Sequence, residues 1–338
     1  MDYRRLGRSG LKVSEICLGT MTFGNGADEV EAARMVHAAF DAGVNFFDTA
    51  NTYVAGVSET MLGKALKGRR QDAVIATKVF NPTGGRVNDS GMSRLHIKQA
   101  VEDSLRRLQT DYIDLYYIHH VDVQTPLEEM LRAFDDLVRQ GKVLYTGCSN
   151  YETWRLMEAL WISDTKGWVR FDAYQPQYNL VVRDIDEELI PACEAKGLGV
   201  VVWSPLAGGY LAGKYEPGAL KAAGTRSTEG WGSQGRFFAH NHAEILQALL
   251  ETAREINRSP AETALRWVMD QPAITSAIVG ARNARQLGET LGAGGWRLPA
   301  EALERLDLVS AQPHRYPRAF EETMVERRQS AIRMPGKK

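Results

Sequence analysis

Short apolar runs alternate along this chain with longer segments in which apolar residues recur at helical spacing. The clearest run contains Val44, Phe46 and Phe47 and stops abruptly at the polar stretch that begins with Asp48. This pattern is typical of a buried strand that ends in a polar loop. Seven further runs have a similar form, and they are Glu15–Leu18, Ala73–Thr77, Tyr112–Ile118, Val143–Gly147, Phe171–Tyr174, Gly199–Trp203 and Thr275–Val279.

Each predicted strand is followed by a segment with helical periodicity. In residues 28–42, for example, Val30, Ala33 and Phe40 fall on one apolar stripe, and Gly43 is suited to cap the C-terminus of that helix. The predicted helices are Asp28–Ala42, Glu59–Leu66, Ser93–Leu108, Pro126–Arg139, Tyr151–Ile162, Asp184–Lys196, Ala243–Asn257, Pro260–Asp270, Ala284–Leu291 and a terminal amphipathic helix, Ala300–Val309.

Eight strand–helix units with short links are typical of a closed (β/α)8 TIM barrel, so we expect an α/β fold with one domain over residues 1–338. An N-terminal hairpin with its turn at Gly7–Gly10 precedes the barrel, and a long Gly-rich loop, Ser204–Phe238, follows the seventh strand. The terminal helix is an addition to the barrel, and the last residues, 327–338, are expected to be loosely held. A doubly wound sheet stays open as an alternative, although residues 19–24 lack the GxGxxG spacing of a dinucleotide-binding turn.

The composition excludes several classes of function. The chain has 41 basic and 42 acidic residues and a net charge of −1, so no nucleic acid or anionic membrane partner is expected. Its apolar runs are far shorter than the roughly 20 residues of a membrane span, and no apolar targeting segment follows Met1–Arg5, so we expect a cytoplasmic protein. Cys17, Cys148 and Cys193 lie far apart without CxxC spacing, and buried, reduced thiols are expected.

Polar residues end three consecutive predicted strands, and they are Asp48, Lys78 and His119. The C-terminal ends of barrel strands share the face on which active sites lie, and neighbouring strands are about 4.8 Å apart. These three side chains should therefore converge, with Tyr53 entering from the loop after the second strand. Asp48 and Lys78 taken alone could be only a structural ion pair.

Tyr53 favours a catalytic interpretation. A free phenol has a pKa near 10, and a nearby ammonium such as Lys78 lowers that pKa while Asp48 holds the ammonium in place. Reduction of a carbonyl by hydride requires such a proton donor, and His119 could orient the carbonyl oxygen. The neighbouring histidines, His119 and His120, also raise the alternative of a metal site, but no further ligand cluster is apparent and no metal is expected.

The motifs FDTANTY, ATKV and DLYYIHHVD, which contain Asp48, Tyr53, Lys78 and His119, resemble the catalytic tetrad of the aldo-keto reductase superfamily. The resemblance extends from GLKVSEICLGTMTFG to VGARNARQLGE. The segments SNYE, YQPQYNL and WSPLAGGYLAGKY look most like those of bacterial members close to the potassium-channel β-subunit branch.

The resemblance implies an NADPH/NADP cofactor extended across the barrel mouth. Ser149, Asn150 and Gln175 would hold the carboxamide, and Trp203 would stack on the nicotinamide. The pyrophosphate would follow Ser204, Pro205, Leu206, Ala207 and Gly208, with Lys214 and Arg226 as cationic partners.

The adenosine end of the cofactor is expected near the last strand. Gly280 and Arg282 precede a helix, and a helix N-terminus together with an arginine suits phosphate. The resemblance places the 2′-phosphate at Arg282 and Gln286 and the adenine near Glu289 and Thr290. Thr290 departs from the asparagine that is usual in relatives. The substrate pocket is expected to be lined by Tyr53 and by Met21, Phe80, His120, Tyr151 and Trp231.

The leading hypothesis is an NADPH-dependent enzyme that reduces aldehydes or ketones, or oxidises an alcohol in reverse, with Tyr53 as the acid. The expected partner is thus a small carbonyl or alcohol, and association into a homo-oligomer stays open. One alternative is an NADPH-binding regulatory subunit like the channel β-subunits, against which the presence of His119 argues. A metal-dependent barrel hydrolase is a third hypothesis.

Overall fold

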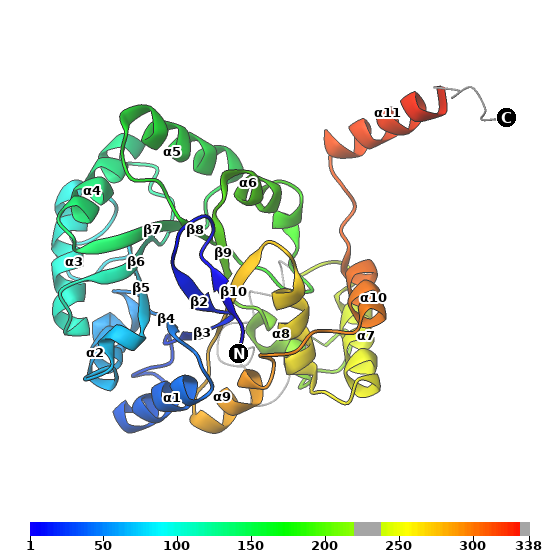
Figure 1. The fold of residues 1–338 in the computed structure, drawn as a ribbon, viewed down its shortest axis with the longest axis horizontal. Coiled ribbons are helices and arrows are strands. Elements are labelled where there is room, and N and C mark those ends of the chain that lie inside the picture. The colour runs from blue at the N-terminus through cyan, green and yellow to red at the C-terminus, as the bar shows by residue number, and fades with distance from the viewer. Residues whose placement is uncertain (220–237, 332–338) are drawn as a thin grey trace.

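The computed structural model describes residues 1–219 and 238–331, and its centre is a closed barrel of parallel strands. The ring order β10-β3-β4-β5-β6-β7-β8-β9 follows the chain order, so that each strand pairs with its successor (Figure 1). This arrangement confirms the predicted (β/α)8 barrel. The strands are β3 (Ile16–Gly19), β4 (Phe46–Asp48), β5 (Val74–Val79), β6 (Ile113–Ile118), β7 (Val143–Ser149), β8 (Ala173–Gln175), β9 (Gly199–Val202) and β10 (Ile274–Val279).

Most of the helices surround the barrel and bury apolar residues against it (Figure 1). In α4, for example, Leu127, Met130, Phe134 and Leu137 are buried at helical spacing. The helices are α1 (Glu29–Asp41), α2 (Val57–Ala65), α3 (Arg94–Leu108), α4 (Leu127–Arg139), α5 (Thr153–Lys166), α6 (Leu189–Lys196), α7 (His242–Glu255), α8 (Pro260–Asp270), α9 (Ala284–Leu291), α10 (Ala300–Ser310) and α11 (Arg318–Ala331).

The predicted hairpin is present and closes the lower, N-terminal end of the barrel. Its strands, β1 (Tyr3–Arg5) and β2 (Lys12–Ser14), pair antiparallel. Leu6 and Val13 are fully buried in one apolar cluster with residues from inside the barrel, such as Phe46 and Leu115. Because this end is plugged, the barrel is open to ligands only at the carboxyl ends of its strands.

Two predicted elements differ from the structure, and one helix was not predicted. The segment Asp184–Lys196 is divided into a 3₁₀ turn, η3 (Asp184–Asp186), and α6, because Pro191 fits only in the first turn of a helix. The predicted loop Ser204–Phe238 contains a 3₁₀ segment, η4 (Ala207–Ala212), in its described part. The helix α11 was not predicted, and it extends away from the barrel in Figure 1.

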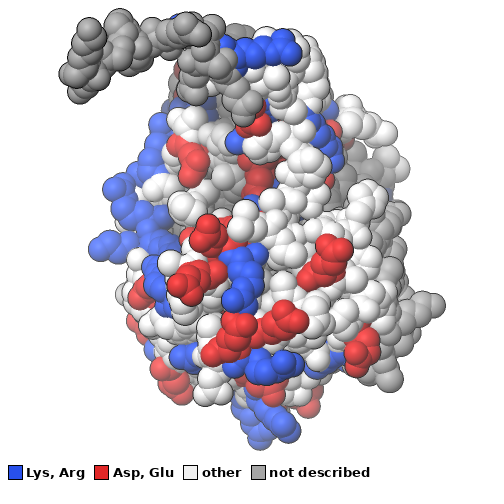
Figure 2. Space-filling view, turned by 90° about the vertical axis from the view of Figure 1, so that its right-hand side faces the viewer, with Lys and Arg blue, Asp and Glu red and all other residues white. Residues whose placement is uncertain are grey.

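The surface agrees with a near-neutral chain. On the face in Figure 2, acidic and basic side chains are interspersed. Within residues 1–219 and 238–331, no helix is long and apolar enough to cross a membrane.

Candidate active site

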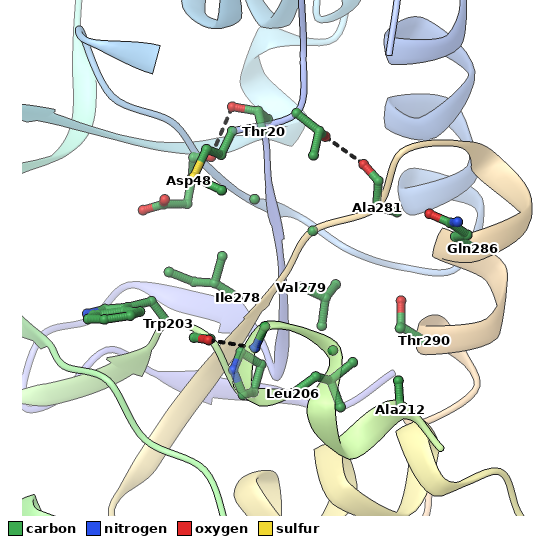
Figure 3. A pocket seen from close by; sticks show the side chains of 18 of the residues that line it. Thr20, Asp48, Trp203, Leu206, Ala212, Ile278, Val279, Ala281, Gln286 and Thr290 are labelled. Atoms are coloured by element: carbon green, nitrogen blue, oxygen red, sulfur yellow. Dashed lines mark hydrogen bonds between the residues drawn. The ribbon is translucent and has the colours of Figure 1, made fainter. Parts of the chain in front are cut away.

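A cavity of about 720 Å³ opens at the carboxyl ends of the barrel strands. Its walls come from segments far apart in the sequence. Figure 3 shows Thr20 after β3, Asp48 at the end of β4, Trp203 after β9 and Thr290 on α9 around one space. The closed barrel thus gathers the ends of its strands around one elongated site.

Lys78 is the centre of the catalytic candidates. Its side chain is 1 % exposed, and its ammonium ion-pairs with the carboxylate of Asp48. Lys78 Nζ also donates to the main-chain oxygen of Thr49 at 2.7 Å and to the hydroxyl of Tyr53 at 3.4 Å. An ammonium has three N–H groups, and each has one acceptor here. Because the Tyr53 oxygen accepts from Lys78, the phenol can direct its own proton to a ligand in the cavity.

The ionisation of this group differs in one respect from the sequence-based expectation. Burial raises the pKa of Tyr53 above its ordinary value and Asp48 adds to the rise, whereas Lys78 only partly opposes it. The expected lowering of the pKa of Tyr53 is therefore wrong for this structure, because desolvation of the phenolate outweighs the nearby ammonium. Burial also disfavours the charge of Lys78, but the charge of Asp48 holds the pKa of Lys78 above its ordinary value. Tyr53 is thus a protonated phenol beside a permanent cation.

His119 is a neutral imidazole in this environment. Burial, together with the charges of Lys78 and His120, lowers the pKa of His119 to about 2. Its Nδ1 lies 3.3 Å from the side-chain amide nitrogen of Asn81, which donates the hydrogen bond and leaves the imidazole proton on Nε2. The ring stacks on His120, with centroids 4.5 Å apart, and meets Tyr53 edge-on at 6.0 Å. Nothing in the sequence had indicated Asn81.

The backbone directly after Tyr53 is strained. Val54 and Ala55 have φ values of 49° and 52°, and Gly56 follows at 89°, so three successive residues are left-handed. This conformation is unfavourable for residues with a Cβ, and most of all for a β-branched one. The turn η1 (Tyr53–Gly56) leads directly into α2, and it fixes where the chain places Tyr53.

The residues expected to hold the carboxamide line the cavity but already bind one another. The amide nitrogen of Asn150 donates to His119 O at 3.1 Å and to Ser149 Oγ at 2.9 Å, while Asn150 Oδ1 accepts from the Trp203 indole at 3.2 Å. Gln175 Nε2 donates to Asp48 Oδ2 at 2.8 Å. Asn150 therefore joins three strand ends and orients Trp203.

Most residues expected at the pyrophosphate and adenosine ends of the cofactor line the same cavity, and they are Ser204, Pro205, Leu206, Gly208, Lys214, Gly280, Arg282, Gln286, Glu289 and Thr290. Ala207 is buried and does not line the cavity. Arg226 lies outside the residues that the structure describes. Ser204, Ala207 and Gly208 are left-handed, which curves the backbone around the cavity. The start of α8, with Ser259 and Glu262, also lines this end and was not predicted to do so.

The expected substrate residues are only partly at the cavity. Met21 and His120 line it, and Phe80 packs edge-on against His120 without being among the described lining residues. Tyr151 is 2 % exposed and packs on Phe171, so the prediction that it lines the substrate pocket is wrong. The left-handed conformation of Asn150, with a φ of 61°, turns the chain back before Tyr151. Trp231 lies outside the described residues.

No group of three or more His, Cys, Asp or Glu side chains within residues 1–219 and 238–331 is arranged to hold a metal ion. The three cysteines are buried and form no disulfide.

Comparison with known proteins gives a consistent result. The aldo/keto reductase family model matches residues 15–311. The chain is 40 % identical to the uncharacterized oxidoreductase YrpG of Bacillus subtilis, over 93 % of this chain and 97 % of that protein. It is 37 % identical to a probable voltage-gated potassium channel subunit beta of Oryza sativa, over 87 % and 91 % of the two chains. A putative aryl-alcohol dehydrogenase of Schizosaccharomyces pombe is 34 % identical, over 90 % and 94 %. The chain belongs to the aldo/keto reductase family.

Proposed function

We propose that this protein is an NADPH-dependent reductase of aldehydes or ketones, with Tyr53 as general acid. The observation that carries the proposal is the ammonium of Lys78, which contacts Asp48, Thr49 O and the Tyr53 hydroxyl beside an open cavity. A structural ion pair needs no further contact at a ligand site. A proton donor such as Tyr53 needs a cation beside it, because the cation stabilises the phenolate that remains after the proton leaves.

The residues present suit an extended dinucleotide. Left-handed residues at Ser204, Ala207 and Gly208 curve the backbone along the cavity, and Ser204 and Gly208 line it. At the other end, Arg282 precedes α9 and lines the cavity, and it would select NADPH over NADH by binding the 2′-phosphate. The nicotinamide, when bound, supplies the hydride.

The protein's own residues move the proton. As the carbonyl carbon gains a hydride, its oxygen gains negative charge and takes the proton of Tyr53, so that an alcohol and a phenolate result. Lys78 stabilises the phenolate until it is reprotonated from solvent, and the Nε2–H of neutral His119 donates a hydrogen bond to the carbonyl oxygen. In the opposite direction the phenolate removes the proton of an alcohol.

The proposal is tested with Tyr53→Phe, which keeps the ring and removes the proton. Carbonyl-dependent oxidation of NADPH should fall at least about 100-fold over a panel of aldehydes and ketones, while NADPH binding by calorimetry stays unchanged. Tyr316→Phe, at an exposed tyrosine before α11, is the matched control and should keep full activity. Turnover retained in Tyr53→Phe would mean that another group is the acid.

The same NADPH oxidation assay tests substrate class and cofactor preference. Because the cavity wall includes Met21, His120 and Trp203, and because one relative is a putative aryl-alcohol dehydrogenase, aromatic aldehydes are expected to be the better substrates. Arg282→Gln should raise KM for NADPH more than KM for NADH. Equal changes in both would contradict the 2′-phosphate assignment.

The second candidate function is a cofactor-binding regulatory subunit, which is favoured by the similarity to proteins named as potassium channel β subunits. This function predicts tight NADPH binding without turnover on any carbonyl. The presence of a neutral His119 beside Tyr53 supports the enzyme instead.

A further inference from the structure

The carboxylate of Asp48 is held from two opposite walls of the barrel. Its Oδ1 accepts from Lys78 on the adjacent strand β5, and its Oδ2 accepts from Gln175 on β8 at 2.8 Å. Strands β4 and β8 are four places apart in the ring of eight, so the hydrogen bond from Gln175 spans the interior of the barrel. Asp48 and Gln175 are both buried, at 3 % and 2 % exposure of the residue.

A carboxylate at this depth depends on its donors. An N–H that binds the charged form favours that form, whereas a buried carboxylate oxygen without a donor takes up a proton more readily. Lys78 supplies one donor, and Gln175 supplies the other. The charge of Asp48 in turn keeps Lys78 an ammonium against the effect of burial, and that ammonium contacts Tyr53.

We infer that Gln175 is a positioning residue of the proton-transfer site, which acts through Asp48 and Lys78 on Tyr53. The inference rests on the proposed function and deepens it, since the resemblance assigns Gln175 only to the carboxamide of the cofactor. One amide N–H of Gln175 binds Asp48, its amide also contacts the buried hydroxyl of Tyr117, and its Oε1 is what a carboxamide could use. The hydroxyl of Ser149 donates to the main-chain oxygen of Gln175 at 2.7 Å and fixes the strand end that presents it.

The test is Gln175→Met, which keeps the length of the side chain and removes the donor. With NADPH and an aromatic aldehyde at saturating concentration, kcat should fall about 10- to 100-fold. The loss should appear in kcat and not in KM for the aldehyde, because Gln175 acts on the proton donor and not on the substrate. Arg282→Gln is the control for weakened cofactor binding, and its loss should appear in KM for NADPH.

A second measurement makes the result independent of turnover. Carbon-13 NMR of labelled aspartate carboxyls, with Asp48→Asn to assign the signal, reports the surroundings of the Asp48 carboxylate in the cofactor-free protein. The chemical shift of that signal should change in Gln175→Met, because Oδ2 loses its hydrogen bond, and stay unchanged in Arg282→Gln. If wild-type protein reduces no carbonyl and the Asp48 signal still moves, the positioning role stands and the proposed function fails. If Gln175→Met only raises the dissociation constant of NADPH, with kcat and the Asp48 signal unchanged, the inference is overturned.

Discussion

Two buried ionic clusters lie at opposite ends of the barrel, and they serve different purposes. The upper cluster pairs Lys78 with Asp48, and the lower one pairs Arg266 with Glu15, and all four side chains are at most 4 % exposed. In the lower cluster Glu15 also accepts from Arg4 at 3.1 Å and from Gly295 N at 2.8 Å.

The two clusters differ in whether one of their hydrogen-bond partners lies at the cavity. Every contact of Glu15 is with another part of the protein, and the hairpin and α8 cover it. Lys78, by contrast, uses its third N–H on Tyr53, a group that lines the cavity. Burial and charge alone therefore do not distinguish a structural ion pair from a catalytic one. A partner that faces a ligand site does.

The strongest way to break the upper cluster is Lys78→Met. Carbonyl reduction should fall about 1000-fold, because the phenolate of Tyr53 loses its cation. Single-turnover measurements with bound NADPH would report the chemical step directly. A variant that kept more than a tenth of the wild-type rate would show that Lys78, like Arg266, has only a structural role.

The corresponding change in the lower cluster is Arg266→Met. It should lower the free energy of unfolding by about 3–5 kcal/mol in urea titrations, because Glu15 loses its fully buried partner. The kcat of the fraction that stays folded should equal that of wild type. A drop in kcat without a loss of stability would mean that the lower cluster acts on the site.

The two ends should also differ in how their contributions to stability depend on pH. The pKa of His119 is lowered to about 2 in the folded state, so below its ordinary value of 6.5 only the unfolded chain takes up this proton. His119 should therefore contribute a loss of stability that approaches about 1.4 kcal/mol per pH unit below pH 6.5, in addition to the contributions of His96 and His120, whose pKa values burial also lowers. His119→Asn should remove the part of the slope that belongs to His119 in thermal or urea unfolding between pH 6.5 and 5.

Glu15 provides the comparison at the lower end. Burial disfavours its charge, but hydrogen bonds from Arg266 and Gly295 and the charges of Arg266 and Arg4 hold the pKa of Glu15 below its ordinary value. A carboxyl of this kind stabilises the fold above its unfolded pKa and loses that contribution as pH falls through the folded one. Glu15→Gln should lower the free energy of unfolding at neutral pH, because Arg266 loses this partner, but it should change the pH dependence of stability only below the window of His119. A change of slope already at pH 6 would contradict this order.

The smallest effect is expected at the strained turn after Tyr53. Val54→Gly removes the strain of a β-branched residue at a φ of 49°. Because the greater conformational entropy of glycine in the unfolded chain offsets part of this gain, the free energy of unfolding should change by no more than about 1 kcal/mol. The rate of carbonyl reduction should fall a few-fold, because Tyr53 is held less rigidly over Lys78. Leu144→Gly, at an exposed strand position, is a control for added flexibility that should leave the rate unchanged.

Much of the fold could be predicted because its evidence is local. The change from apolar to polar residues at Asp48, Lys78 and His119 marks strand ends, and parallel strand ends share one face. By contrast, α11 was missed because its apolar residues form no clear stripe. Tyr151 was misplaced because the left-handed conformation of Asn150 is not visible in residue types.

The sequence by itself determined the order of eight strands and helices, the N-terminal hairpin and the identity of four residues that converge. Only the tertiary structure decided how these residues are ionised and held. The bond from Gln175 to Asp48 joins residues 127 positions apart and exists because the barrel closes. The raised pKa of Tyr53 and the neutral state of His119 likewise depend on desolvation, which no spacing in a sequence encodes.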